Sequence, residues 1–262
     1  MNIGFSTGSI ALGDFRKGIA LLRKRNIKTI ELSSLRETEL PDLIAALHDL
    51  DLRDFEHVSF HAPSKLSIYS EHQLICFLNK VAEKGWLIIV HPDIISDFSL
   101  WQSLGNLLCI ENMDKRKNVG RTFADLEKIF NKLPLATFCL DVAHARQVDP
   151  TMTEALLMIK KFRTKLKQLH VSDVNTQSFH EPLNLEAILA FSRIAPYIPE
   201  NLPVILESPV TEDKINSEIE IASMIFDSKK LTKFFKPYKD TSIYFFNQLN
   251  ELKKNKIHLG GI

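Results

Sequence analysis

The sequence predicts an α/β protein of the (β/α)8 barrel class, in which eight parallel strands form a ring covered by helices. Short runs rich in apolar and β-branched residues recur eight times, at a spacing of about 20 to 36 residues, the length of one strand and one helix. Amphipathic segments with apolar residues at helical spacing lie between these runs. Alternating strands and helices favour a parallel sheet covered on both faces, and eight such units favour a closed barrel.

The individual elements follow from these two periodicities. The eight strands are expected at residues 1–6, 28–33, 57–62, 86–92, 106–112, 136–142, 167–173 and 203–209. Helices are expected at residues 15–24, 40–50, 73–84, 123–130, 153–162 and 185–194. Asp42 near the start of the second helix and Thr122 directly before the fourth are residue types that mark helix N-termini.

The end of the chain carries no further strand signal, so it is expected to close the barrel with helices. These closing helices are predicted over residues 211–255, the last of them in FNQLNELKK at 246–254. No linker or low-complexity segment interrupts the pattern. We therefore expect one domain over residues 1–262, because barrels of about 250 residues are routinely single domains.

Composition narrows the classes of function and partner. The net charge of +1 gives no global basic field for nucleic acid, so any such binding would be local. The N-terminus lacks a signal-peptide layout, and no apolar run approaches the roughly 20 residues that span a membrane. Cys76, Cys109 and Cys139 lie in or beside apolar runs without metal-type spacing, so we expect reduced core cysteines in a cytoplasmic protein.

Carboxylates and imidazoles gather where the predicted strands end. In a barrel of this class the C-terminal strand ends and the loops after them build the active site. The acidic, amide and histidine residues at these positions are Glu31, His61, His91, Glu111, Asn112, Asp141, His144, His170, Asp173, His180 and Glu207. So many ionisable groups at one barrel mouth would repel one another or lack hydrogen-bond partners. Divalent metal ions would remove this cost, because carboxylate oxygen and neutral imidazole nitrogen are their ligands.

The loop after the fifth expected strand adds positive charge to the same rim. Its sequence, NMDKRKNVGR, carries Lys115, Arg116 and Arg121. Basic side chains beside a metal site suit an anionic substrate, most simply a phosphate. A solvated charged loop is the plainer interpretation of the same residues.

Several short motifs together resemble a known group of barrels. They are HAPSK at 61–65, VHPD at 90–93, IENM at 110–113 with GRT at 120–122, LDVAHA at 140–145, LHVSDV at 169–174, FHEPL at 179–183 and ILESP at 205–209. In their order and their places at strand ends they resemble the xylose-isomerase-like barrel superfamily. The branch they resemble most contains endonuclease IV and the sugar phosphate isomerases and epimerases. The resemblance covers about four-fifths of the chain, from the first expected strand to the eighth.

Endonuclease IV-like enzymes hold three zinc ions and cleave a phosphodiester at an abasic site. The resemblance implies a first metal held by His61, His91 and Glu111. It implies a second metal, bridged to the first by Glu111, that Asp141, His170 and Glu207 complete. His144 and His180 would begin a third. The family places an Asp two residues before the last histidine, where this chain has Ser178, so two metals are expected and the third site lacks an acidic ligand.

The hydrolase hypothesis assigns catalysis to Glu111, Asp141 and Glu207 around two neighbouring ions. Such a pair of ions activates a water and stabilises the leaving oxygen of an in-line displacement. Zinc is the favoured metal, and manganese or iron are the alternatives because the same ligands accept them. The expected substrate is a phosphoester or another small molecule, contacted by Glu31, Asn112, Asp173 and the three basic residues of the loop.

Two other functions are compatible with the same residues. Sugar isomerases and epimerases of this superfamily use one metal held by residues that match Glu111, Asp141, His170 and Glu207, and Glu31 would then contact a sugar hydroxyl. Only the multinuclear hydrolase needs both His61 and His91, so these two histidines distinguish the hypotheses. A barrel that binds a ligand without turnover is the third possibility, because Ser178 replaces an acidic ligand. The sequence leaves the oligomeric state open.

Overall fold

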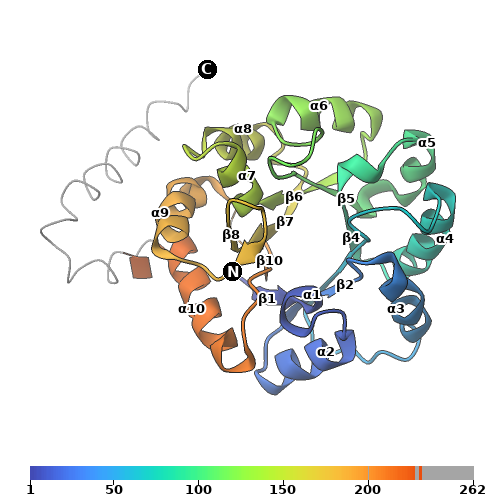
Figure 1. Ribbon diagram of the computed structural model, residues 1–262, viewed down its shortest axis with the longest axis horizontal. Coiled ribbons are helices and arrows are strands. Elements are labelled where there is room, and N and C mark those ends of the chain that lie inside the picture. The colour runs from blue at the N-terminus through green and yellow to red at the C-terminus, as the bar shows by residue number, and fades with distance from the viewer. Residues whose placement is uncertain (200, 228–229, 232–262) are drawn as a thin grey trace, which may run out of the picture.

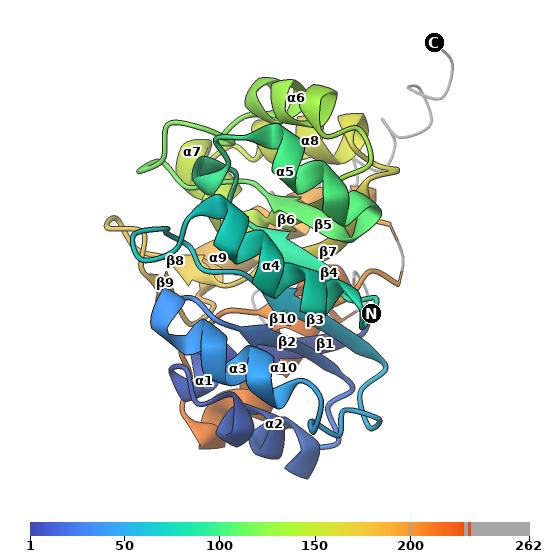
Figure 2. The same cartoon turned by 90° about the vertical axis from the view of Figure 1, so that its right-hand side faces the viewer.

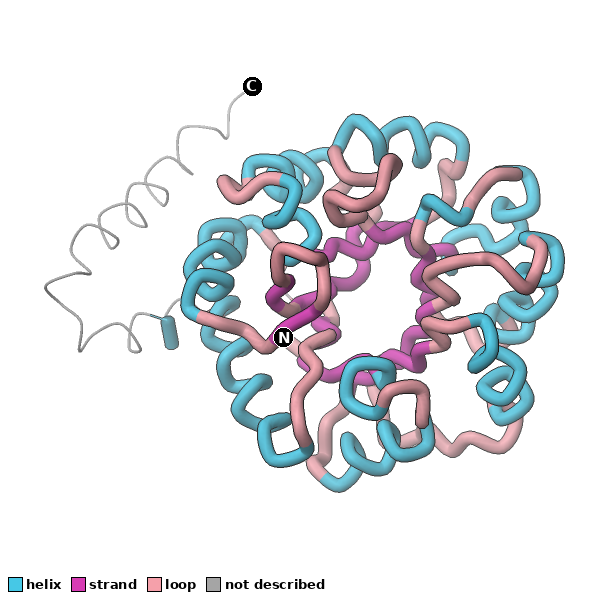
Figure 3. The backbone as a smooth tube through the Cα atoms, in the orientation of Figure 1, coloured by secondary structure: helices cyan, strands magenta, loops and turns pink. Residues whose placement is uncertain are grey.

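A closed barrel of eight parallel strands forms the centre of the protein. The computed structural model describes residues 1–199, 201–227 and 230–231. The barrel strands are β1 (Ile3–Ser6), β2 (Thr29–Ser33), β3 (His57–His61), β4 (Leu87–Val90), β5 (Leu108–Glu111), β6 (Thr137–Asp141), β7 (Leu166–Val171) and β10 (Val204–Leu206). They pair in the order β1-β10-β7-β6-β5-β4-β3-β2, which closes on itself, as Figure 1 and Figure 3 show. The fold predicted from the periodicity is therefore confirmed.

Helices surround the barrel on its outer side (Figure 2). They are α1 (Thr7–Ala11), α2 (Phe15–Lys24), α3 (Leu40–Ala46), α4 (Glu71–Ala82), α5 (Phe98–Trp101), α6 (Phe123–Lys132), α7 (Val142–Val148), α8 (Thr153–Lys161), α9 (Leu185–Ile194) and α10 (Ile215–Phe226). Thr122 caps α6 as predicted, since its side chain accepts a hydrogen bond from the Asp125 backbone N–H. Asp42 does not cap α3, because the helix begins at Leu40 and places Asp42 in its first turn.

Several short elements were not predicted from the sequence, among them helices α1, α5 and α7 and the strands β8 and β9. Helix α7 begins directly after β6. Strands β8 (Asp173–Val174) and β9 (His180–Glu181) form a small antiparallel hairpin after β7. Of the predicted closing helices, α10 is observed, and the one expected at 246–254 lies outside the described residues. No helix in the described part of the chain is long and apolar enough to cross a lipid bilayer.

The apolar core lies between the strands and the helices, and the barrel interior is chemically mixed. Alternate residues of each strand point outward to the helices, so Ile110 and Leu140 join the large core. The inward positions of β4, β5 and β6 carry a separate apolar cluster of Ile89, Cys109 and Cys139. Cys109 and Cys139 are thus buried as expected. Cys76 is exposed on α4, so its assignment to the core was wrong.

Candidate metal centre

The predicted carboxylates and imidazoles come together at one end of the barrel. Most lie on the inward face of a barrel strand or directly after it, two lie further along the chain, and all but two are almost completely buried. The members are Glu31 on β2, His61 on β3, His91 after β4, Glu111 on β5, Asp141 on β6, His144 on α7, His170 on β7, His180 on β9 and Glu207 after β10. His91 and His180 are the partly exposed members, with side chains 14% and 33% exposed, so they mark the mouth of the centre.

The local structure around β6 explains why Asp141 points inward. The Asn112 amide donates to the Asp141 backbone oxygen at 2.9 Å, and the Asp141 N–H donates to the Asn112 side-chain oxygen at 2.8 Å. The Asp141 carboxylate also caps α7, since its Oδ1 accepts from the His144 backbone N–H at 2.7 Å. Its other oxygen, Oδ2, has no hydrogen-bond partner in the described structure. Asp141 is therefore held in place through Oδ1 and its backbone, while Oδ2 faces His144 Nδ1 at 3.5 Å without a hydrogen bond.

Glu111 lies between two sets of ligands and offers one oxygen to each. Its Oε2 is 3.2 Å from His61 Nε2 and 3.4 Å from His91 Nε2. Its Oε1 is 3.3 Å from His170 Nδ1 and 3.4 Å from His144 Nδ1. This is the arrangement of a carboxylate that can bridge two neighbouring cations.

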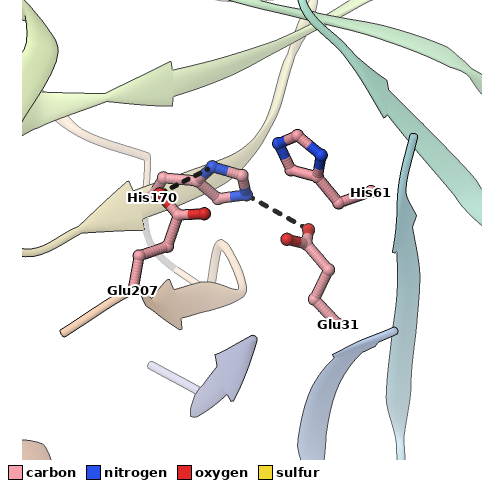
Figure 4. Close-up of side chains that lie close together, drawn as sticks. All are labelled: Glu31, His61, His170 and Glu207. Atoms are coloured by element: carbon pink, nitrogen blue, oxygen red, sulfur yellow. Dashed lines mark hydrogen bonds and ion pairs between the residues drawn. The ribbon is translucent and has the colours of Figure 1, made fainter. Parts of the chain in front are cut away.

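The hydrogen bonds of two histidines leave a ring nitrogen facing carboxylates. His61 Nδ1 lies 2.7 Å from the Ala62 carbonyl, which only accepts, so that nitrogen carries a proton. His170 Nε2 likewise lies 3.1 Å from Glu31, as Figure 4 shows. In a neutral ring the opposite nitrogens, His61 Nε2 and His170 Nδ1, would then present lone pairs to carboxylate oxygens. That contact is repulsive unless a cation or a proton lies between them.

The potential ligand atoms form three overlapping groups in the described part of the chain. In each group the ligand atoms lie within 4.8 Å of one another. The groups are His61, His91 and Glu111; Glu111, Asp141, His170 and Glu207; and Glu31, His61, His170 and Glu207. The first two are the sets expected from the sequence. Imidazole and carboxylate donors, with unpartnered buried atoms at Asp141 Oδ2 and His170 Nδ1, fit two divalent ions.

Without metal, protons take the place of the cations. Burial lowers the pKa of His61, but the hydrogen bond to Glu111 and the nearby carboxylates outweigh it and raise the pKa to about 9. Burial opposes ionisation of Glu111 as well, yet the charge of His170 and bonds from three histidines hold its pKa well below the usual value. Burial raises the pKa of Glu207 to about 8. The metal-free centre therefore holds protonated imidazoles around the Glu111 carboxylate.

At the third site, which the sequence already leaves without an acidic ligand at Ser178, the side chains bond to other partners. The rings of His144 and His180 are neighbours, with centroids 5.6 Å apart. The Ser178 hydroxyl, however, donates to Gln147 Oε1 at 2.6 Å, and His180 Nδ1 bonds to Ser172 Oγ at 2.8 Å. Within the described residues, no group of three or more ligands includes either histidine. Burial also lowers the pKa of His180 to about 3, so its ring is neutral.

The residues expected to contact substrate have different environments. Asn112 is occupied by the Asp141 backbone, and Asp173 accepts from Arg146 at 2.6 Å. Arg116 pairs with Asp114 at 2.7 Å, which occupies its guanidinium. The remaining predicted contacts differ in exposure. Lys115 is exposed, Arg121 is half-buried with an unbonded Nε, and Glu31 is fully buried inside the barrel.

Sequence reasoning missed two polar residues that support the centre from inside the barrel. Ser59 and Gln168 both donate to Glu31 Oε2, at 2.9 Å and 2.7 Å. The signal was available in the strand period, because Ser59 precedes His61 by two residues and Gln168 precedes His170 by two.

Comparisons with known proteins agree with this architecture. Protein-family models and curated proteins give no match to the sequence. The structure of endonuclease IV from Thermus thermophilus matches with a TM-score of 0.58 at 16% identity, covering 89% of this chain and 100% of that one. SacUVDE matches with a TM-score of 0.53 at 14% identity, over 85% and 98% of the two chains. L-ribulose 3-epimerase matches with a TM-score of 0.51 at 14% identity, over 83% and 86%.

The chain therefore has the TIM-barrel fold that these solved structures share. Proteins named for DNA-related and for sugar-related activities share this fold. The fold does not select between them, so the function is argued from the centre itself.

Proposed function

We propose that the protein is a divalent-metal-dependent hydrolase that cleaves a phosphoester, with two metal ions at the barrel mouth. The observation that carries the proposal is the position of Glu111, whose two oxygens face two different sets of ligands. A single-metal centre has no use for a second set at His61 and His91. Two bound divalent ions would polarise a phosphoryl oxygen, lower the pKa of water and stabilise both oxygens of an in-line displacement.

The protein's own residues would hold these ions and orient the substrate. His61, His91 and Glu111 would hold one ion, and Asp141, His170 and Glu207 with Glu111 would hold the other. The hydrogen bonds from Asn112 and from the α7 backbone keep Asp141 from turning away. Zinc is the preferred metal for such a mixed imidazole and carboxylate set, with manganese and iron as alternatives.

The substrate would enter past the two exposed histidines, His91 and His180. Arg121 is the cation of the loop after β5 that we expect to meet a phosphate. Gly120, the residue before it, lies against Pro92, which follows His91 directly. Within the described residues Arg121 forms no ion pair, and its Nε is buried without a partner. A guanidinium in that state favours an anionic ligand.

Metal content per chain tests the proposal directly. Protein purified without chelator should contain two divalent ions and hydrolyse a chromogenic phosphodiester. His61→Ala/His91→Ala should retain one ion and lose hydrolysis. His48→Ala/His72→Ala is the matched control, because both of these histidines are exposed and neither belongs to a ligand group. A wild type with one ion, unchanged in the His61/His91 variant, would refute the two-metal hydrolase.

A sugar isomerase or epimerase is the second candidate, and one observation favours it. Glu111, Asp141, His170 and Glu207 form a complete ligand group without the two mouth histidines. Two carboxylates of such a site can take and return a proton at carbon. Under this alternative, His61→Ala/His91→Ala keeps its single metal and converts ketose sugars as the wild type does.

A further inference from the structure

Glu31 faces Nε2 of the His170 ring, whereas Glu111 and Glu207 face Nδ1. It is fully buried on β2, and Figure 4 shows it next to the His170 ring. A single oxygen, Oε2, accepts from Ser59 Oγ at 2.9 Å and from Gln168 Nε2 at 2.7 Å. The same oxygen lies 3.1 Å from His170 Nε2. Donors that converge on one oxygen favour an ionised carboxylate and fix its position.

The contact with Glu31 determines which nitrogen of His170 is free. An ionised carboxylate only accepts hydrogen bonds, so a proton on His170 Nε2 satisfies this contact. The Gln168 amide nitrogen is also 3.0 Å from His170 Nε2, but its shorter bond, 2.7 Å, is to Glu31 Oε2. The lone pair of the neutral ring is then on Nδ1. That atom is 3.3 Å from Glu111 Oε1 and 3.5 Å from Glu207 Oε2, and it has no hydrogen-bond partner in the described residues.

The barrel register places the supporting groups beside Glu31. Glu31 and Ser59 are direct partners in the β2–β3 pairing, so their side chains point inward at the same level. Gln168 precedes His170 by two residues on β7 and shares its inward face. The Gln168 side-chain oxygen bonds to His57 Nε2 at 2.9 Å, which turns the amide NH₂ toward Glu31.

We propose that Glu31 is a positioning residue that holds His170 in the Nε2-protonated form, with Nδ1 directed at the metal. The proposal rests on the metal centre proposed above but not on the phosphoester substrate. It is an alternative to the sequence-based hypothesis that Glu31 contacts a sugar hydroxyl: Glu31 is fully buried, Oε2 has three partners, and Oε1 has no hydrogen-bond partner in the described residues. Partners of this kind on a metal-binding histidine typically contribute roughly 10- to 100-fold to metal affinity.

The test compares Glu31→Gln with Glu218→Gln. Glu218 is the matched control, since its carboxylate is buried on α10 and accepts from the Leu183 N–H at 2.8 Å. The zinc dissociation constant is measured by competition with a chromogenic chelator. Ring nitrogens of ¹⁵N-histidine are observed by NMR in the zinc-loaded proteins. We expect Glu31→Gln to bind zinc roughly 10- to 100-fold more weakly and to lose the wild-type His170 Nε2–H signal, while Glu218→Gln matches the wild type.

Ser59→Ala is a milder variant that keeps the proposal testable if Glu31→Gln does not fold. It removes one of the three bonds to Glu31 Oε2, so zinc affinity should fall in the same direction by a smaller factor. A Glu31→Gln protein within twofold of wild-type affinity, or with the wild-type ring signals, would overturn the proposal. Loss of a whole zinc equivalent at saturation would overturn it too, because Glu31 would then be a ligand itself. A wild type that binds no zinc would instead overturn the proposed function.

Discussion

Metal uptake by the metal-free protein should release protons at neutral pH. The pKa of His61 is raised to about 9 against the opposing effect of burial, and burial raises that of Glu207 to about 8. At pH 7 these values leave both His61 and Glu207 mainly protonated. Both groups must lose the proton to bind a cation. Together they should release about two protons, and His170, whose pKa is raised well above its usual value, should add about one more.

The two metal ions should displace different numbers of protons, and these numbers should set how the metal affinity depends on pH. The first set contains His61, so its ion should displace about one proton; His91 adds none, because burial lowers its pKa. The second set contains His170 and Glu207, so its ion should displace about two. Because the pKa values of these groups are raised, the groups keep their protons at every pH below the raised pKa. Affinity should therefore fall as pH falls, by about tenfold per pH unit for each proton displaced.

Calorimetric titration of zinc into metal-free protein measures this number. Titrations in two buffers with different heats of ionisation give the protons released per ion. His48→Ala should release the wild-type number, because the His48 side chain is 94% exposed and distant from the ligands. Release of fewer than about one proton for both ions together, or an affinity that is constant between pH 6.5 and 8, would refute the assigned protonation states.

Two further predictions concern the rim of the barrel. Arg121→Met should raise the KM for a phosphodiester by roughly 10- to 100-fold, because a lost charged hydrogen bond costs about 1.5 to 3 kcal/mol. Arg116→Met should change the KM little, because Asp114 already pairs with the Arg116 guanidinium. Steady-state kinetics of both variants test this prediction. Ser178→Asp should raise the metal content from two to three per chain, because it supplies the acidic ligand that this sequence lacks two residues before His180. Elemental analysis measures this, and three metals in the wild type would contradict the two-metal assignment.

The fold could be predicted because the repeat of apolar runs and amphipathic segments can be seen in the sequence without knowledge of contacts between distant residues. Eight apolar runs separated by amphipathic segments leave few alternatives to a barrel. The positions of Glu111 and Asp141 followed in turn, since parallel strands of one barrel bring their C-terminal ends together. Helix α7 was missed because Val142 to Val148 is short and begins without a break after β6, so its start is masked by the strand pattern.

The environment of each site residue could not be predicted in the same way. Arg116 and Asp173 have the right type and place for substrate contacts, yet each is occupied by a neighbour from another position in the chain. Cys76 follows two apolar residues but lies on the outer face of α4, because helical rotation of 100° per residue separates adjacent positions. Pairing of this kind depends on rotamers and loop geometry, which local sequence does not specify.

The strands carry polar residues on their inward faces and apolar residues on their outward faces, and this explains how the fold stays stable with a polar barrel interior. Buried ionisable groups are costly to desolvate, and a cluster of this size contributes little net stability without its cations. The outward faces pack a continuous apolar core against the helices, with fully buried side chains such as Phe60 and Phe138. Stability therefore comes mainly from residues that the centre does not use. Substitutions of Glu31 or His61 should accordingly change metal affinity more than they change folding, which makes metal binding the more sensitive measure of both proposals.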